Sequence, residues 1–89
     1  MSSKYYYLDI ETSTELSALT VRRSIEVAAK SIFGECGAAE LNVDVLRSEG
    51  RRALLRVHEE KLRKLWAALT LAASELRVLK HSPSLQALI

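Results

Sequence analysis

Few side chains in this sequence are of the types that perform catalysis. The 89 residues include two histidines, His58 and His81, and one cysteine, Cys36. A nucleophilic or acid–base site needs such groups to converge with a serine or a carboxylate, and no motif brings them together. The adjacent carboxylates Glu59 and Glu60 diverge on a helix, no CxxC spacing indicates zinc, and the glycines fit no phosphate-binding loop. We therefore expect no catalytic residue, no metal site and no cofactor.

Nucleobase stacking is a second chemistry that the residue types allow. Tyr5 and Tyr7 share one face of a predicted strand, and residues 52–58 place Arg52, Arg56 and His58 on the outer face of another. Sheet aromatics stack on bases in RNA-recognition motifs, although residues 52–58 lack the aromatic-and-glycine signature of those domains. We keep RNA contact as an alternative. The residues expected to make it are Tyr5, Tyr7, Arg52, Arg56, Arg77 and Lys80.

The stretch that follows His58 has helical periodicity and an unusually apolar second half. Residues 67–73 are apolar or small almost all round. A helix that is apolar on both sides needs cover on both sides, and a chain of this length has little left to provide it. Two interpretations stay open: Leu71 is a single exposed leucine, which is common, or Ala67, Ala68 and Leu71 contact another protein. The side expected to be buried holds Leu62, Leu65, Trp66, Leu69, Ala72 and Ala73.

Alternation of apolar and polar residues predicts the strands. Residues 5–11 place Tyr6, Leu8 and Ile10 on one face, and residues 40–45 and 52–58 alternate in the same way. A turn at residues 48–50 joins the last two into a hairpin, and residues 76–80 are expected to form a short final strand. The buried side of the hairpin is expected to hold Leu41, Val43, Val45, Ala53, Leu55 and Val57.

A long helix is predicted between the first strand and the hairpin. Residues 11–14 are polar and rich in N-cap types, so the helix is expected to begin there. Gly34 and Gly37 are expected to end it. The predicted buried stripe holds Val21, Ile25, Ala28, Ala29 and Ile32.

The predicted order of elements is therefore β-α-β-β-α-β. Two right-handed βαβ crossovers around a hairpin give a four-stranded antiparallel sheet with both helices on one face. We expect a ferredoxin-like α+β sandwich, the arrangement that RNA-recognition motifs also have. No linker, repeat or biased segment divides the chain, so residues 1–89 are expected to form a single domain.

The size of the chain favours a partner subunit. Hydrophobic residues at 48% and charged residues at 27% are typical of globular proteins. A chain this short buries little more than ~60% of the surface that it exposes when unfolded, and small domains compensate with disulfides, metals or partners. With one cysteine and no metal motif, a partner is the remaining option.

The distribution of charge and hydropathy limits the other binding roles. The net charge is +2, but residues 51–89 carry eight Lys and Arg against three Asp and Glu, so any phosphate-facing surface should lie there. The sequence has neither a signal peptide nor an apolar run of ~18 residues. We therefore expect a soluble intracellular protein with no membrane partner, and nothing indicates a small-molecule substrate.

Several segments together resemble a known family. The SIFGE run at residues 31–35, the KLWAALTL run at residues 64–71 and the RVLKHSPSL run at residues 77–85 resemble the small Pop-type protein subunits of ribonuclease P and ribonuclease MRP. The similarity spans most of the chain. It is closer to the smaller, accessory eukaryotic paralogue than to the paralogue that most resembles the archaeal subunit.

The resemblance implies a non-catalytic subunit of a ribonucleoprotein endonuclease whose catalytic centre is RNA with bound metal ions. Such subunits support 5′ maturation of precursor tRNA or, in the MRP particle, rRNA processing. The implied partners are a second Pop-type subunit in a heterodimer, a barrel-fold subunit of the same particle, and the particle's RNA, directly or through other subunits. The implied location is the nucleus and nucleolus.

The expected protein interface comprises Ala67, Ala68, Leu71, Phe33 and Gly34. The alternative function is a free-standing module that binds single-stranded RNA with the outer sheet face. A small ferredoxin-fold enzyme is a distant third.

Overall fold

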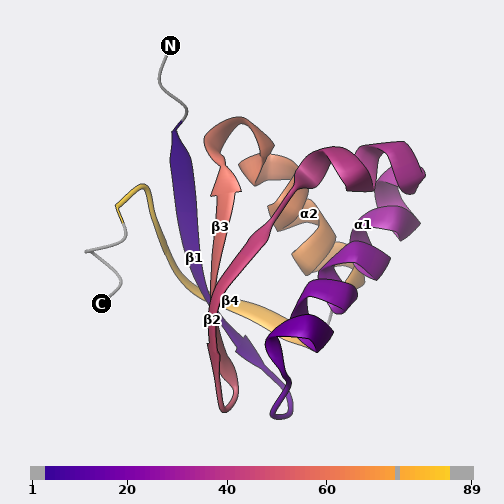
Figure 1. Cartoon of the computed structure of the whole chain (residues 1–89). Coiled ribbons are helices and arrows are strands. Elements are labelled where there is room, and N and C mark those ends of the chain that lie inside the picture. Colours follow the sequence, from indigo (N-terminus) through magenta and orange to yellow (C-terminus); the bar gives the residue numbers. More distant parts are fainter. Residues whose placement is uncertain (1–3, 74, 85–89) are drawn as a thin grey trace.

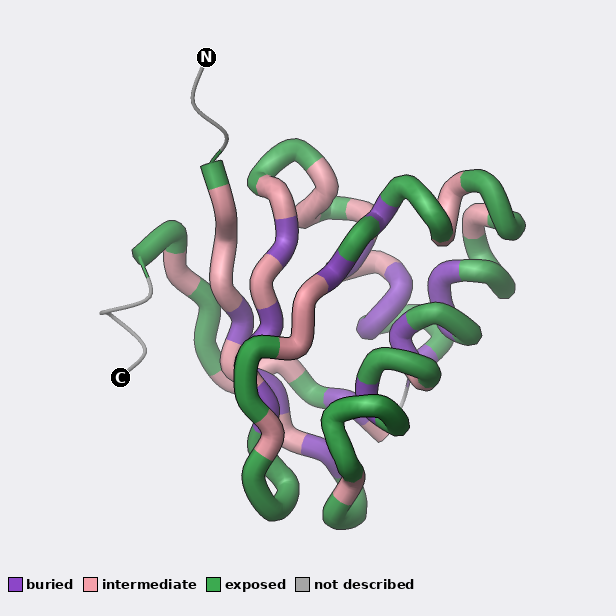
Figure 2. Tube along the Cα trace, in the orientation of Figure 1, coloured by how far each residue is buried: buried purple, intermediate pink, exposed green. Residues whose placement is uncertain are grey.

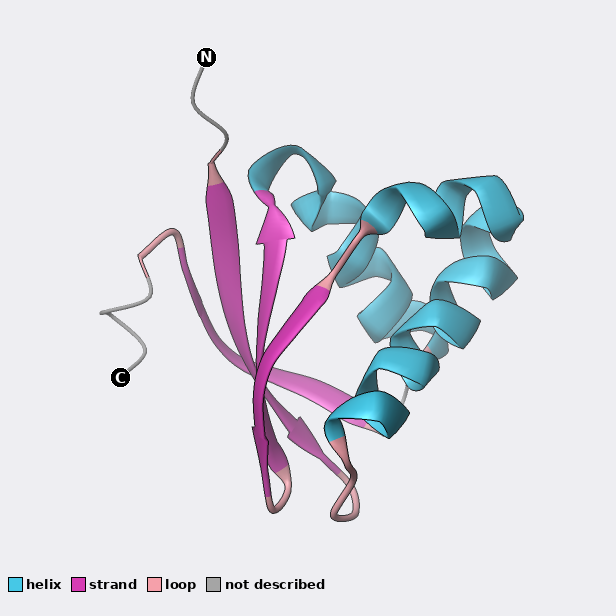
Figure 3. Cartoon of the chain, in the orientation of Figure 1, coloured by secondary structure: helices cyan, strands magenta, loops and turns pink. Residues whose placement is uncertain are grey.

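The chain folds into an antiparallel sheet with helices on one side. The computed structural model describes residues 4–73 and 75–84. Both helices lie on the same side of the sheet (Figures 1 and 3). The predicted β-α-β-β-α-β order and α+β sandwich are confirmed. The elements are β1 (Tyr5–Thr12), α1 (Ala18–Leu41), β2 (Asp44–Glu49), β3 (Arg52–His58), a 3-10 turn (Glu59–Lys61), α2 (Leu62–Ala72) and β4 (Leu76–Ser82).

The sheet has the strand order β2-β3-β1-β4. The two central strands, β1 and β3, pair from Tyr5 opposite His58 to Glu11 opposite Arg52. Because successive residues of a strand point to opposite faces, the sheet has a helix-facing side and an outer side. Residues alternate between buried and less buried along β1 and β3 (Figure 2). The helix-facing side holds Leu8, Ile10, Ala53, Leu55 and Val57, all buried, as the sequence predicted.

The hairpin between β2 and β3 has a two-residue turn. Glu49 lies opposite Arg52, so Gly50 and Arg51 form the turn, slightly later than the predicted residues 48–50. Gly50 has a φ of 58°, in the left-handed region that glycine adopts without steric cost. A positive φ at the first turn residue fits a tight hairpin, which accounts for the glycine here.

α1 begins later than the sequence predicted. Thr12 is the last residue of β1 and is buried, so residues 11–14 do not start the helix. The N-cap is Ser17, whose Oγ accepts a hydrogen bond from the Thr20 backbone N–H at 3.2 Å. Because Thr12 is already paired in the sheet, it cannot also cap the helix, and Ser17, five residues later, provides the cap.

Gly34 divides α1 into two helical segments joined by a bend. Its φ of 76° and ψ of 177° lie in a region that is essentially restricted to glycine. After the bend the helix continues through Gly37 to Leu41, and Asn42 closes it with a φ of 51°. The prediction that the helical conformation stops at Gly34 is therefore confirmed, whereas Gly37 lies inside the second helical segment and its predicted role as a terminator was wrong. So was the predicted strand over residues 40–45, because β2 starts only at Asp44.

The core lies between the sheet and the two helices. From α1 it takes Val21, Ile25, Ala28 and Ala29, as predicted. Ile32 was predicted to be buried but is 36% exposed. Ile32 lies two residues before the bend at Gly34, where the first helical segment ends. From α2 and the residue after it the core takes Leu65, Ala68, Leu69 and Ala73.

α2 shows a second difference from the predicted buried side. The helix proper starts at Leu62, after the 3-10 turn. Ala72 is exposed and Trp66 is half-buried, whereas Ala68 is fully buried. The buried side of α2 is therefore rotated from the predicted one: it includes Ala68 and leaves out Ala72.

Candidate protein and nucleic-acid interface

The outer sheet face brings together most of the residues predicted to contact RNA. Tyr5 and Tyr7 of β1 lie opposite His58 and Arg56 of β3, and Lys80 of β4 lies opposite Asp9. Residues that oppose each other in an antiparallel pair share one face. The face therefore has an aromatic end, around Tyr5, and charged side chains along the rest of its strands.

The aromatic end is packed within the chain. The Tyr5 and His58 rings stack with centroids 4.7 Å apart, and the Arg56 guanidinium lies 4.6 Å from the Tyr5 ring centroid. Offset stacking and cation–π contact both use the ring face. A nucleobase that stacked on Tyr5 would compete with these two contacts.

Arg52 and Arg77 of the outer face form ion pairs with carboxylates on β1, the strand beside each of them. Arg52 donates from Nε and Nη2 to the two carboxylate oxygens of Asp9. Arg77 Nη2 donates to Glu11 Oε1 at 3.0 Å. Hydrogen bonding to Asp9 raises the pKa of Arg52, so this guanidinium is fully charged and held by its partner.

Arg56 of the central strand β3 is paired in a similar way with Asp44 of the edge strand β2. It donates from Nη2 at 2.8 Å and from Nε at 3.1 Å to Asp44 Oδ2. The hydrogen bond to Asp44 raises the pKa of Arg56. Three of the predicted RNA-contacting arginines are thus engaged within the chain, which the alternation pattern of the sequence did not reveal.

His81 lies on the helix-facing side, at the β4 edge. Its Nδ1 is 2.9 Å from the Tyr6 hydroxyl, and the two rings stack with centroids 5.7 Å apart. The Trp66 ring meets His81 edge-on at 4.9 Å. The cluster joins β1, β4 and α2, so His81 packs and forms a hydrogen bond between these elements.

The groups that could perform chemistry stay apart in the part of the chain that the structure describes. Cys36 is exposed on the second segment of α1, away from both histidines in sequence. Over residues 4–73 and 75–84, no three His, Cys, Asp or Glu side chains gather where they could hold a metal ion. No helix among these residues is long and apolar enough to cross a membrane.

The predicted protein interface on α2 is only partly at the surface. Leu71 is 74% exposed and Ala67 is half-buried, in keeping with a contact surface. Ala68 is fully buried against the core, so its predicted place in that interface was wrong. The error arises because α2 turns Ala68 towards α1, which the near-uniform apolar composition of residues 67–73 could not show.

The bend in α1 lies near the start of α2. Phe33 is partly buried, and Lys64 Nζ lies 5.6 Å from its ring centroid. Glu40 Oε2 lies 3.8 Å from Lys61 Nζ and 3.8 Å from Lys64 Nζ, so it forms an ion pair with each lysine. These contacts fix how far α1 and α2 are shifted along each other.

Val27 is an exposed apolar residue that the sequence analysis missed. It is 63% exposed and lies outside the predicted buried stripe, on α1, the helix that packs against α2. The two helices are antiparallel, because they start at opposite ends of the sheet (Figure 1). Counted from the Phe33–Lys64 contact, Val27 and Leu71 lie about 9 and 10 Å along their helices at 1.5 Å per residue. They therefore lie at the same level of the helix layer.

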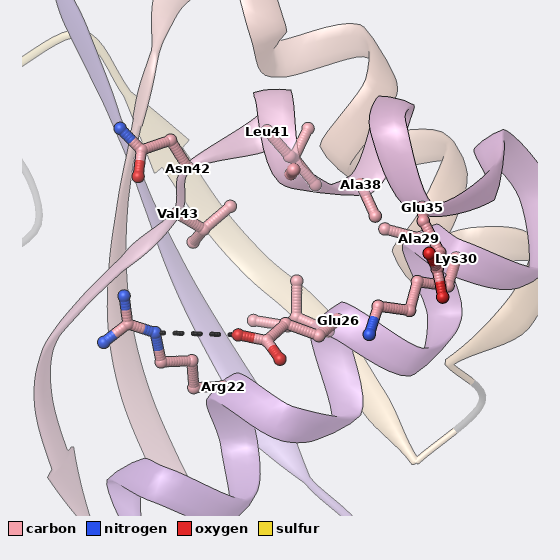
Figure 4. Close-up of a pocket in the computed structure, with 11 residues that line it drawn as sticks. Arg22, Glu26, Ala29, Lys30, Glu35, Ala38, Leu41, Asn42 and Val43 are labelled. Atoms are coloured by element: carbon pink, nitrogen blue, oxygen red, sulfur yellow. Dashed lines mark ion pairs between the residues drawn. The ribbon is translucent and has the colours of Figure 1, made fainter.

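A cavity of about 280 Å³ lies between the two segments of α1 (Figure 4). Ile25, Ala29, Leu41 and Val43 give it an apolar lining. Charged side chains surround this lining, and Arg22 Nε lies 4.0 Å from Glu26 Oε1. Its size and apolar lining fit a hydrophobic side chain better than a cofactor, which needs several convergent polar groups.

Comparison with known proteins identifies the family. The family model described as "Ribonucleases P/MRP protein subunit Pop8" matches residues 3–71, from β1 to the end of α2. The chain belongs to this Pop8 family of ribonuclease P/MRP protein subunits. The resemblance seen in the sequence, including its closeness to the smaller eukaryotic paralogue, is confirmed. β4, with Arg77 and Lys80, lies beyond the matched residues.

Relatives and a solved structure agree with this assignment to the Pop8 family. The chain is 34% identical to "Ribonuclease P protein subunit p14" of Homo sapiens over 99 aligned residues, which cover 97% of this chain and 79% of that protein. The Mus musculus protein of the same name is also 34% identical, with 97% and 80% covered. A chain in the cryo-EM structure of yeast ribonuclease MRP superposes with a TM-score of 0.78 at 15% identity, covering 94% of this chain and 77% of that one. At this identity the structural match supports the fold.

Proposed function

We propose that this Pop8-family chain is a non-catalytic docking subunit of ribonuclease P/MRP. It supports 5′ maturation of precursor tRNA, processing of rRNA, or both, by joining other protein subunits of the particle. The observation that carries the proposal is a pair of exposed apolar side chains on the helices of a chain that belongs to this family. Leu71 is 74% exposed and Val27 is 63% exposed, and they lie at one level of neighbouring helices. Burying them against a partner would remove apolar surface from water, the main favourable contribution to association.

The proposed partner on the helix layer is the second Pop-type subunit, in a heterodimer. A standard interface buries roughly 800 Å² on each partner, and the whole chain exposes 5761 Å². An interface of that size would take roughly a seventh of the exposed surface of the chain. The barrel-fold subunit of the same particle is proposed as a second partner, and the RNA is reached through these proteins.

The proposal of a non-catalytic role is supported by where the polar side chains are engaged. Ion pairs with carboxylates engage Arg52, Arg56 and Arg77, and a hydrogen bond joins His81 to Tyr6. In this proposal the RNA performs the cleavage chemistry, and the protein contributes position and stability.

Depletion of the chain in its own cells tests the proposed function. We expect precursor tRNA with uncleaved 5′ extensions, unprocessed rRNA precursors, or both to accumulate, and to disappear when the wild-type chain is restored. A Leu71→Glu chain should fail to restore processing, while an Ala72→Glu chain, changed at an exposed position of the same helix, should succeed. Normal levels of all these precursors after depletion would contradict the proposal.

The proposed location is the nucleus, with concentration in the nucleolus. A fluorescent fusion expressed at the natural level tests this, with a nucleolar marker as reference. A signal confined to the cytoplasm would contradict a role in the particle.

A further inference from the structure

The outer sheet face carries charges of both signs in a regular cross-strand pattern. Its basic side chains are Arg47, Arg52, Arg56, Arg77 and Lys80, and its acidic side chains are Asp9, Glu11, Asp44 and Glu49. One row crosses the whole sheet with alternating sign. From β4 to β2 it runs Arg77, Glu11, Arg52, Glu49. A face with five basic and four acidic side chains has almost no net charge, despite its four arginines.

Each of these arginines lies against a carboxylate. Arg52 uses both nitrogens of its fork on Asp9, whose side chain is only 14% exposed. Arg56 does the same on Asp44. The remaining two pairs join Arg77 to Glu11 and Arg47 to Glu49, at 3.0 and 3.1 Å.

These pairs oppose binding of a phosphate backbone. RNA gains affinity when a Lys or Arg neutralises a phosphate and releases its counterion. A guanidinium already bonded to a carboxylate has little net charge to offer, and the carboxylate repels the approaching phosphate. The same arginines without their partners would form a basic sheet face of the kind that binds RNA.

Folding stability accounts for only some of these pairs. The bidentate pair of Arg52 with the largely buried Asp9 stabilises the fold, whereas the more exposed pairs of Arg77 with Glu11 and of Arg47 with Glu49 contribute little. A chain that works beside a large RNA, however, needs protection from binding that RNA at arbitrary places.

We propose that Asp9, Glu11 and Asp44 are specificity determinants that keep the sheet-face arginines from RNA phosphates. The chain then enters its RNA-containing particle through protein contacts and not through its sheet. This inference rests on the proposed function, because it explains why a docking subunit would mask a basic face.

The test compares RNA binding by the wild-type chain and an Asp9→Asn, Glu11→Gln, Asp44→Asn variant. The probe is a fluorescein-labelled oligouridylate, and binding is followed by anisotropy across a range of KCl concentrations. Each phosphate newly neutralised on a single strand makes the plot of log affinity against log salt steeper by ~0.7. Three freed arginines should therefore make the negative slope steeper by about 2. Between about 50 and 200 mM KCl, the affinity of the variant should fall roughly 20-fold more than that of the wild type.

A matched control separates this effect from net charge. The Glu15→Gln, Glu26→Gln, Glu35→Gln variant has the same net charge but keeps every sheet-face pair. We expect its salt slope to stay within about 1 of the wild-type slope, as for a diffuse charge effect. Circular dichroism on all variants checks folding. A Glu11→Gln, Asp44→Asn variant, which retains the less exposed Asp9, should show about two-thirds of the gain.

Two results would overturn the inference. One is an equal gain in RNA affinity for the sheet-face variant and its control. The other is a wild-type chain that already binds with a steep salt slope, which Arg52→Gln and Arg56→Gln then reduce. That second result would favour the alternative of an RNA-binding sheet. Neither result bears on the partner test with Leu71, so failure of this inference and failure of the proposed function are separable.

Discussion

Truncation of Leu71 to alanine should affect partner binding far more than folding. With 74% of the residue exposed, only about a quarter of its surface is buried within the chain. Complete burial of a leucine contributes ~1.5–3 kcal/mol, so Leu71→Ala should lower the free energy of unfolding by at most about 0.8 kcal/mol. If a partner buries the remainder, the same change should cost about 1–2 kcal/mol of binding free energy, a rise in Kd of roughly 5- to 30-fold.

Two measurements on the same proteins check the prediction for Leu71. Denaturant unfolding gives the stability of the isolated chain, and titration calorimetry gives its affinity for the second Pop-type subunit. Leu65→Ala is the control for folding: Leu65 is fully buried, and the change should cost about 2–5 kcal/mol of stability. The reasoning is refuted if Leu71→Ala destabilises the chain as much as Leu65→Ala does, or if it leaves the Kd unchanged.

Three further predictions concern the fold and can be checked by denaturant unfolding. Ala68→Glu would bury a charge in the core and should cost about 3 kcal/mol or more, while Ala72→Glu, at an exposed position, should stay within about 0.5 kcal/mol; equal effects would place Ala68 at the surface after all. Gly34→Ala should cost about 1–3 kcal/mol through its backbone angles alone, since no atom lies within 4 Å of the added methyl group. Ser17→Ala should cost about 1 kcal/mol by removing the N-cap bond to Thr20, and an unchanged stability would show that the bond contributes nothing.

The two central strands of the sheet could be predicted from the sequence because the alternation of apolar and polar residues is local and repeated. Alternation over residues 5–11 and 52–58 defines two faces, and burying Leu8, Ile10 and Leu55 fixes which face meets the helices. The order of elements then leaves few topologies, since crossovers are right-handed and hairpins pair directly.

The boundaries of α1 were harder to predict, because they depend on competition between structures. Thr12 has an N-cap side chain, yet pairing of β1 with β4 extends to it and keeps it in the sheet. Gly34 does interrupt the helix, yet a second helical segment follows it and buries Leu41 in the core. Neither the extension of β1 nor this second segment can be derived from a local pattern.

The sequence predicted which residue types lie near the candidate interface, but not which of them are buried or paired within the chain. Leu71 was correctly expected at the surface, whereas Ala68 was not, because a run of alanines does not show which side meets α1. The arginines were correctly placed on the outer face. Their pairing with Asp9 and Asp44 depends on cross-strand register and side-chain reach, which only the assembled sheet defines.

Affinity purification of the tagged chain from its own cells, with protein and RNA both identified, tests the central claim most directly. We predict recovery of the second Pop-type subunit, a barrel-fold subunit and one large structured RNA, all lost together when Leu71 is changed to glutamate. Recovery of diverse short RNAs without a stable protein partner would contradict the account and favour a free-standing RNA-binding module.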